Sequence, residues 1–408
     1  MKSPLYKESN IRDNFAVFPD YSPGSWKINP NILSEQAHEL WLQENRAPII
    51  ISEDVSLRPK ILDACGMTCT FCHNEGTPVT SEAINQGRPG YRSLGRVSIF
   101  SENNGVNFLP GRMRPDENLY EALSSLSKAV GIEEVHLTGG EPTLHSEIPE
   151  IIGLARSMGL RVRMTSNGEN PKVLEKCAEA GLERVSFSIF GTTALELSQV
   201  QHPRFQNQKF AQRKIDSLRN SIKLSGELGI DTSANIVVPG PGHEERVISI
   251  VNEFEHLSLK LLNSLDEGDA SFASIYELLA RLEATPSKVK LTAGSSNTRI
   301  DYSLPNNTEI SFKQIRPARF NHICEGCEID KAGKCEEGFY GLRLYINQEG
   351  EYLVGMCIQR MDLAMHLDEF LNSGLPAKIT GFRQAEKKSM ISQFGNLATQ
   401  DIGINREE

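Results

Sequence analysis

The sequence predicts an α/β fold built on a parallel sheet or barrel, with a small cysteine-rich β-hairpin domain near its C-terminal end. From Pro59 onward, short apolar runs alternate with stretches of helical periodicity, which is typical of parallel strands joined by helices. Alternating residues at 342–346 and 352–354 flank a Gln-Glu-Gly turn and predict a hairpin. Seven of the eight cysteines form two groups, one in each of these regions.

The predicted elements follow one another along the chain. The strand at 60–63 leads directly into the first cysteine group, and the strand at 134–138 opens into two glycines. Gly131, Gly159 and Gly181 stand where helices end. Further strands are predicted at 160–165, 184–190, 231–238 and 289–291, and helices at 119–130, 148–158, 171–180, 208–228, 245–257 and 272–283.

These patterns divide the chain into four parts. Residues 1–55 form an N-terminal extension whose amphipathic stretch Leu33–Leu42 is expected to pack on another surface. Residues 56–317 form the core with the strand–helix alternation. Residues 318–375 form the cysteine-rich hairpin domain, and residues 376–408 form a helical tail.

Composition excludes several classes of protein. The apolar share of 39% and the charged share of 24% are those of a globular protein, not of a disordered or fibrous one. There is no run of about eighteen apolar residues, so no membrane span is expected. The formal net charge of −10 makes nucleic acid an unlikely partner. The first residues do not resemble a secretory signal, so the cysteines are expected to be reduced thiols or metal ligands. This expectation favours a cytoplasmic location.

The first cysteine group is Cys65, Cys69 and Cys72. Three thiolates within eight residues converge only if the backbone wraps around one object, and soft thiolates suit zinc or an iron–sulfur cluster. A closed zinc site needs four ligands, usually in Cys-x-x-Cys pairs, so this spacing fits zinc poorly. Three cysteines on a four-iron cube leave one iron open to a substrate. Three buried thiols that are close by chance are the alternative.

The spacing of these cysteines resembles the signature of the radical S-adenosylmethionine (radical SAM) superfamily. Phe71 stands directly before the third cysteine, and family members with an aromatic residue at that position are similar in this respect. Residues 137–142, Leu-Thr-Gly-Gly-Glu-Pro, resemble the motif that holds the amino group of the cofactor. The resemblance implies a partial parallel (β/α)6 barrel and reductive cleavage of S-adenosylmethionine to a 5′-deoxyadenosyl radical. It also implies cofactor contacts from Phe71, Gly139, Gly140, Glu141, Ser166 and Ser188, and a 4Fe–4S cluster on Cys65, Cys69 and Cys72.

The second cysteine group is Cys324, Cys327, Cys335 and Cys357, which leaves Cys177 as a core thiol on an apolar helix face. Four thiolates suit a zinc ion or a second 4Fe–4S cluster. The pattern resembles the C-terminal region of the cyclase that starts molybdenum-cofactor biosynthesis, and the SPASM and twitch domains with their auxiliary clusters. This chain departs from that cyclase in its fourth cysteine, in its lack of a Gly-Gly tail, and in having only Arg343 where the cyclase has several arginines.

The function expected from this resemblance is hydrogen abstraction from a small metabolite or peptide, giving oxidation, rearrangement or bond formation. A flavodoxin or ferredoxin would supply the electron. A GTP cyclase-like enzyme and a non-enzymatic metal- or cluster-binding scaffold are the alternatives. Arg161 and Arg163 alternate with apolar residues, so they face the barrel interior as an anion site or lie at the solvated start of a strand. His136 is expected to be a core histidine.

Overall fold

The computed structural model describes most of the chain. The described residues are 29–69, 111–254, 257–264, 267–316, 318–327, 330, 335, 337–357, 360, 363–394 and 398–400. No helix among them is long and apolar enough to cross a membrane.

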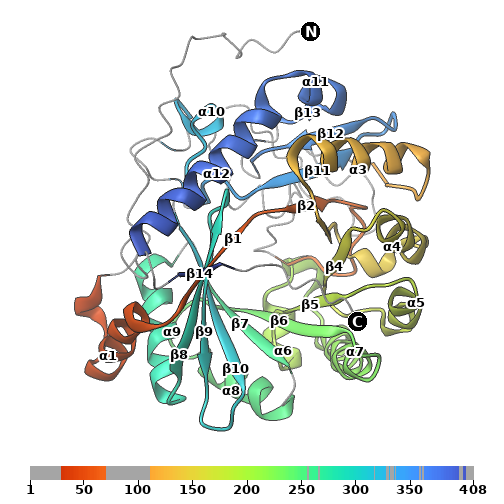
Figure 1. Ribbon diagram of the computed structural model, residues 1–408. Coiled ribbons are helices and arrows are strands. Elements are labelled where there is room, and N and C mark those ends of the chain that lie inside the picture. Colours follow the sequence, from red (N-terminus) through yellow and green to blue (C-terminus); the bar gives the residue numbers. More distant parts are fainter. Residues whose placement is uncertain are drawn as a thin grey trace.

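Six parallel strands form the centre of the molecule, and helices join them and cover their outer side (Figure 1). This arrangement confirms the predicted partial (β/α)6 barrel. In spatial order, the strands are β2 (Ser56–Pro59), β3 (Glu134–Leu137), β4 (Arg161–Ser166), β5 (Arg184–Ile189), β6 (Asp231–Val238) and β7 (Ser258–Asn263). The helices between them are α3 (Glu117–Val130), α4 (Ile148–Ser157), α5 (Leu174–Glu179), α6 (Ala194–Gln199), α7 (Gln208–Glu227) and α8 (Glu244–Glu253).

The same sheet continues beyond both edges of the barrel. Next to β7 come β10 (Glu309–Ile315), β9 (Asn297–Ser303), β8 (Thr285–Ala293), β1 (Ile49–Glu53) and β14 (Ala398–Gln400). Next to β2 come β11 (Leu342–Ile346), β12 (Tyr352–Gly355) and β13 (Met365–His366). The strands β7, β9 and β10 were not predicted from the sequence, and only the centre of β8 was. It predicted the β11–β12 hairpin correctly.

The described part of the N-terminal extension packs on the barrel. Its helix α1 (Glu35–Gln43) begins at Ser34, whose hydroxyl caps the helix by accepting from the amide of Ala37. α1 packs against α9 (Gly268–Arg281), and β1 pairs in parallel with β8. The surface on which the Leu33–Leu42 stretch packs is thus part of this chain.

The hairpin region also joins the barrel sheet. Leu342 of β11 pairs in parallel with Leu57 of β2, and the buried side chains of Leu344 and Val354 belong to the same apolar core as the barrel. The helix α11 (Leu367–Asn372) packs beside β12, and α12 (Leu375–Phe394) packs on β1, β8 and α3. The predicted helical tail is present in α12.

The two faces of the barrel sheet differ in polarity. On β5, Val185, Phe187 and Ile189 are buried in the core beneath the helices, whereas Ser186 and Ser188 lie on the opposite, concave face. The same alternation recurs on the other strands, where the apolar partners are also fully buried. The barrel therefore encloses a polar interior, as the sequence pattern of β5 predicts.

Glu44 is a buried carboxyl group in the turn between α1 and β1, and it joins the N-terminal segment to the barrel. It accepts hydrogen bonds from Tyr276 Oη at 3.1 Å and Tyr302 Oη at 2.5 Å. Burial raises the pKa of Glu44 from its ordinary value of 4.5 to about 8, although both hydrogen bonds oppose the shift. The folded protein therefore keeps a proton that the unfolded chain releases at lower pH.

We expect Glu44→Gln to remove a pH dependence of stability. Because the pKa is raised by folding, the contribution of the bound proton is fully present below about pH 4.5 and is lost as the pH rises to about 8. Between about pH 5 and pH 8, the free energy of unfolding of the wild type should fall by on the order of 3 kcal/mol more than that of the variant. Denaturant unfolding at both pH values measures this. Exposed Glu39 on α1 offers the control Glu39→Gln, and identical pH profiles for wild type and Glu44→Gln would contradict the expectation.

Candidate active site

The first cysteine loop and the Gly-Gly-Glu turn lie against each other at the carboxyl ends of the parallel strands. Gly140 N donates to Leu62 O at 2.8 Å, and Glu141 N donates to Ala64 O at 2.8 Å. A Cβ on Gly140 would lie 2.2 Å from Ala64 O, so the backbones approach to a distance that only glycine permits. The two motifs are about seventy residues apart in sequence and adjacent in space, as expected for one site.

The carboxylate of Glu141 ties the ends of β3 and β4 together. It accepts hydrogen bonds from Ser166 Oγ at 2.7 Å, from the amide of Asn167 at 2.6 Å, and from the hydroxyl and amide of Thr143 at 2.7 and 3.0 Å. Only 1% of Glu141 is exposed, and burial raises its pKa although each of these hydrogen bonds opposes the shift. Ser166 therefore contacts Glu141, and both side chains fix the shape of the turn.

Cys65 is half-buried and its sulfur accepts from two donors. Asn167 Nδ2 lies 3.7 Å from Cys65 Sγ, and the amide of Met67 lies 3.4 Å from it. Amide donors to a thiolate are typical of the surroundings of cluster-binding cysteines. Asn167 stands directly after β4, so a second strand end reaches the cysteine loop.

A buried ion pair supports the same loop. Glu169 Oε1 accepts from the amide of Gly66 at 3.0 Å, and Glu169 Oε2 pairs with Lys214 Nζ of α7. Burial lowers the pKa of Lys214, while the neighbouring charges of Cys65 and Glu141 raise it. Neither Glu169 nor Lys214 was predicted from the sequence to belong to the site. The position of Glu169 two residues after Asn167 was the available signal.

Cys69 is held from the opposite side by Gln201, which lies between α6 and α7. The two residues form an isolated antiparallel bridge, and Gln201 Nε2 lies 3.5 Å from Cys69 Sγ. Gln201 Oε1 accepts from the amide of Thr68 at 2.8 Å. Gln201 is buried, and its side-chain amide is held in orientation by its contacts with Thr68 and Cys69 of the first cysteine loop. Gln201 was not predicted from the sequence to belong to the site.

The remaining predicted residues of this site have different positions. Cys72 and Phe71 lie outside the described residues. Ser188 is half-buried on the concave face near the carboxyl end of β5. Among the described residues, no three His, Cys, Asp or Glu side chains are arranged to hold a metal ion. The two described thiols, their amide donors and the close glycine backbone fit an iron–sulfur cluster.

Cys324 of the second cysteine group ends α10 (Asn321–Cys324), and Cys357 lies just after the end of β12. Burial raises the pKa of Cys324 to about 12, and the charges of Cys357 and Cys335 act in the same direction, while the amide hydrogen bond to Phe320 and the charge of Arg319 oppose it. The amide of Cys327 donates to Cys324 O at 3.1 Å, and Arg360 Nη1 lies 3.8 Å from Cys327 Sγ. All four cysteines are among the described residues, and no group of three His, Cys, Asp or Glu side chains there is arranged to hold a metal ion.

Arginines approach this second group more closely than the sequence predicted. Arg319 donates to the carbonyl of Cys335 at 2.6 Å and pairs with Asp330 at 2.6 Å, and Arg360 contacts Cys327. Arg319 and Arg360, which stand five residues before Cys324 and three residues after Cys357, were not considered beside Arg343 in the sequence-based prediction. Cys177 is fully buried and burial raises its pKa to about 12, which confirms it as a core thiol.

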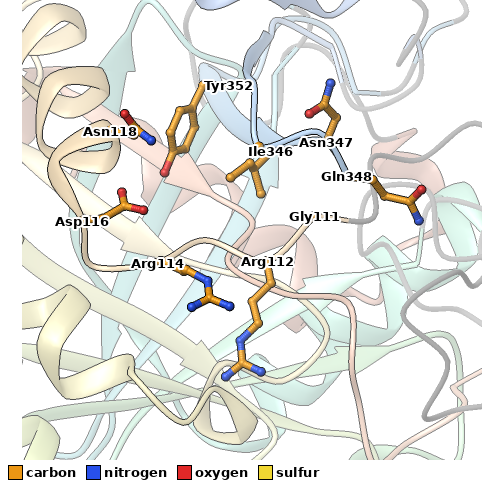
Figure 2. A pocket seen from close by; sticks show the side chains of 10 residues that line it. Gly111, Arg112, Arg114, Asp116, Asn118, Ile346, Asn347, Gln348 and Tyr352 are labelled. Carbon is orange, nitrogen blue, oxygen red and sulfur yellow. The ribbon is translucent and has the colours of Figure 1, made fainter.

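A polar pocket of about 310 Å³ adjoins the site at the hairpin edge (Figure 2). Arg112 and Arg114 line it from the segment before α3, and Asn347 and Gln348 line it from the turn between β11 and β12. Arg112 also contacts His145 Nε2 at 3.2 Å, just beyond the Glu141 turn. The pocket contains none of the predicted site residues.

Comparison with known proteins gives matches to a family model, to curated proteins and to solved structures. Residues 60–253 match the family model described as the radical SAM superfamily. The probable GTP 3′,8-cyclase of Metallosphaera sedula is 27% identical over 277 residues, covering 66% of this chain and 75% of that protein. The probable GTP 3′,8-cyclase of Sulfolobus acidocaldarius is 33% identical over 135 residues, so the match covers only 33% of each chain.

Among solved structures, Streptococcus suis SuiB bound to S-adenosylmethionine aligns with a TM-score of 0.44 and 15% identity, covering 81% of this chain and 68% of that chain. The region that matches the family model runs from the end of β2 to the end of α8 and contains the first cysteine loop, the Gly-Gly-Glu turn and Gln201. The chain carries a radical SAM domain over residues 60–253, and enzymes of that superfamily bind a 4Fe–4S cluster and S-adenosylmethionine.

Proposed function

We propose that this protein holds a 4Fe–4S cluster on Cys65, Cys69 and Cys72 and removes a hydrogen atom from a small metabolite or a peptide. The observation that carries the proposal is the contact between the cysteine loop and the Gly139–Glu141 turn at the carboxyl ends of the barrel strands. When bound, the cluster and S-adenosylmethionine supply the 5′-deoxyadenosyl radical that takes the hydrogen atom.

The chain's own residues position these groups. Asn167 and Gln201 donate to the sulfurs of Cys65 and Cys69 and fix the orientation of both thiolates. Glu141 fixes the turn so that Gly139 and Gly140 present backbone to the amino acid part of the cofactor. Phe71, Ser166 and Ser188 are further cofactor contacts in this proposal. A flavodoxin or ferredoxin in the cytoplasm would supply the electron.

The second cysteine group is proposed to ligate an auxiliary 4Fe–4S cluster through Cys324, Cys327, Cys335 and Cys357. Four thiolates leave no iron open, so this cluster suits electron transfer from a substrate radical. After anaerobic reconstitution, we expect about eight irons per chain, falling to about four in Cys324→Ala/Cys327→Ala, by the arithmetic of two cubane clusters. Stoichiometric zinc with about four irons in the wild type would instead make the second site a zinc site.

GTP cyclisation is a second candidate function. It is favoured by the relatives named GTP 3′,8-cyclase and by the approach of Arg319 and Arg360 to the second cysteine group. A fourth thiolate on the second cluster would weigh against it, because no iron would remain to bind the nucleotide. Incubation of the reduced, reconstituted protein with GTP and S-adenosylmethionine separates the two candidates. Robust formation of a cyclised nucleotide would identify GTP, and not a small metabolite or a peptide, as the substrate.

A further inference from the structure

The concave face of the barrel carries an accumulation of positive charge. Cationic side chains stand on this face because their strand neighbours on the other face are buried apolar residues, such as Leu259 and Leu261 beside Lys260. The same alternation places Ile310 and Phe312 in the core beside Lys313. The cations of this face are Arg163 on β4, Lys260 on β7, Lys313 on β10, Arg299 on β9, and Lys288 and Lys290 on β8.

Carboxylates neutralise only part of this charge. Glu134 pairs with Arg163 at 2.7 Å. Asp301 pairs with Arg299 at 2.8 Å and with Lys290 at 3.0 Å, and Lys288 lies 3.8 Å from it. In the part of the chain that the structure describes, neither Lys260 nor Lys313 has a carboxylate within ion-pair distance. The face therefore retains an excess of positive charge at these two lysines.

The surroundings of Lys260 consist of hydroxyl groups and other cations. Its ammonium donates to Ser233 Oγ at 2.8 Å and to Ser186 Oγ at 3.3 Å. Burial and then the charges of Arg299, Arg184, Arg163 and Lys313 lower the pKa of Lys260 to about 7. Each cation thus makes the charged form of its neighbours less favourable. A bound anion would relieve the repulsion among these cations.

An aromatic ring completes this face. Lys313 Nζ and the guanidinium carbon of Arg58 each lie 4.9 Å from the centroid of the Tyr340 ring. The hydroxyl of Tyr340 donates to Asn297 Oδ1 at 3.3 Å, and His136 Nε2 lies 2.7 Å from Thr165 Oγ1 on the same face. These contacts hold the cationic groups in place without neutralising them.

We propose that the basic wall, defined as Arg163, Lys260, Arg299 and Lys313, binds an anionic group of the substrate, either a phosphate or a carboxylate. This rests on the proposed function, because it places the substrate inside the barrel. Asn167, which contacts Cys65, directly follows β4 and is four residues beyond Arg163, so Arg163 lies roughly 13 Å from the cysteine loop at the rise of about 3.3 Å per strand residue.

The test is a calorimetric titration of the reconstituted protein with inorganic pyrophosphate in one arm and citrate in the other. The variants are Lys260→Met and Lys313→Met, and the control is Lys223→Met on the exposed side of α7. We expect saturable binding in at least one arm, weakened tenfold or more by each wall variant and unchanged by the control. The arm that binds more tightly identifies phosphate or carboxylate as the group recognised.

Thermal unfolding provides a second readout. Lys260 is half-buried and repelled by the neighbouring cations, so the melting temperature of Lys260→Met should equal or exceed that of the wild type. The increase in melting temperature caused by added anion should be lost in this variant. Equal anion affinity in wild type and both wall variants, or no saturable binding in the wild type, would overturn the proposal. Because neither readout requires cleavage of S-adenosylmethionine, anion binding by a protein that cannot cleave it would contradict the proposed function and not the site.

Discussion

Gly140→Ala should disrupt the first cluster site. The added Cβ would lie 2.2 Å from Ala64 O and 2.3 Å from Asp63 O, and these are backbone atoms of the segment that connects β2 to Cys65. Since backbone cannot turn aside as a flexible side chain does, the turn or the cysteine loop must shift. Overpacking of this kind costs about 1–3 kcal/mol in stability, and a shift of about 1 Å at a reactive centre costs about a hundredfold in rate.

Iron content and the yield of 5′-deoxyadenosine after reconstitution measure the effect. We expect the iron of the first site to be largely lost and the yield of 5′-deoxyadenosine to fall about a hundredfold. Gly153→Ala is the matched control, because its Cβ would meet no atom within 4 Å and alanine is favoured within helix α4. A Gly140→Ala protein with full iron content and full yield would show that the contact between the two motifs is not required.

Glu386→Ala should be the most destabilising substitution in the C-terminal helix. Its carboxylate makes two contacts with the guanidinium of Arg316, at 2.6 and 2.8 Å, and accepts from the amide of Gly294 at 2.6 Å. Both side chains are almost fully buried, with 0% and 1% exposure. Removing one partner of a buried ion pair costs about 3–5 kcal/mol in stability, because the charge of the other partner stays buried with nothing to compensate it.

Denaturant unfolding measures this loss. The neighbouring Lys387 pairs with Glu53 at 2.8 Å, and both side chains are 29% exposed, so Lys387→Ala should cost only about 0–1 kcal/mol. The contrast between adjacent positions on one helix isolates the effect of burial. Similar losses for both variants would mean that α12 is not held to the segment after β10 through this pair.

The sequence predicted the barrel because its helices and several strands carry strong local signals. Val185, Phe187 and Ile189 alternate with serines, and glycines mark the helix ends, so β5 and the helix boundaries are legible without tertiary information. The cysteine loop and the Gly-Gly-Glu turn were recognisable because each motif is contiguous in sequence. Their contact followed from the rule that parallel strands end at one edge.

The parts that could not be predicted depend on contacts between distant segments. The strands β7, β9 and β10 carry Lys260, Arg299 and Lys313 on the concave face, and these charged residues interrupt the apolar runs by which buried strands are recognised. Gln201 and Lys214 reach the cysteine loop from elements more than a hundred residues away. No local pattern distinguishes them from ordinary polar side chains.

The central claim is that Cys65, Cys69 and Cys72 together hold the cluster that drives the reaction. Its most direct test is the formation of 5′-deoxyadenosine from S-adenosylmethionine by the anaerobically reconstituted, dithionite-reduced protein, compared with Cys65→Ala/Cys69→Ala/Cys72→Ala. The account predicts 5′-deoxyadenosine from the wild type and none above background from the triple variant, which would keep only the iron of the second site. Undiminished cleavage by the triple variant would contradict it.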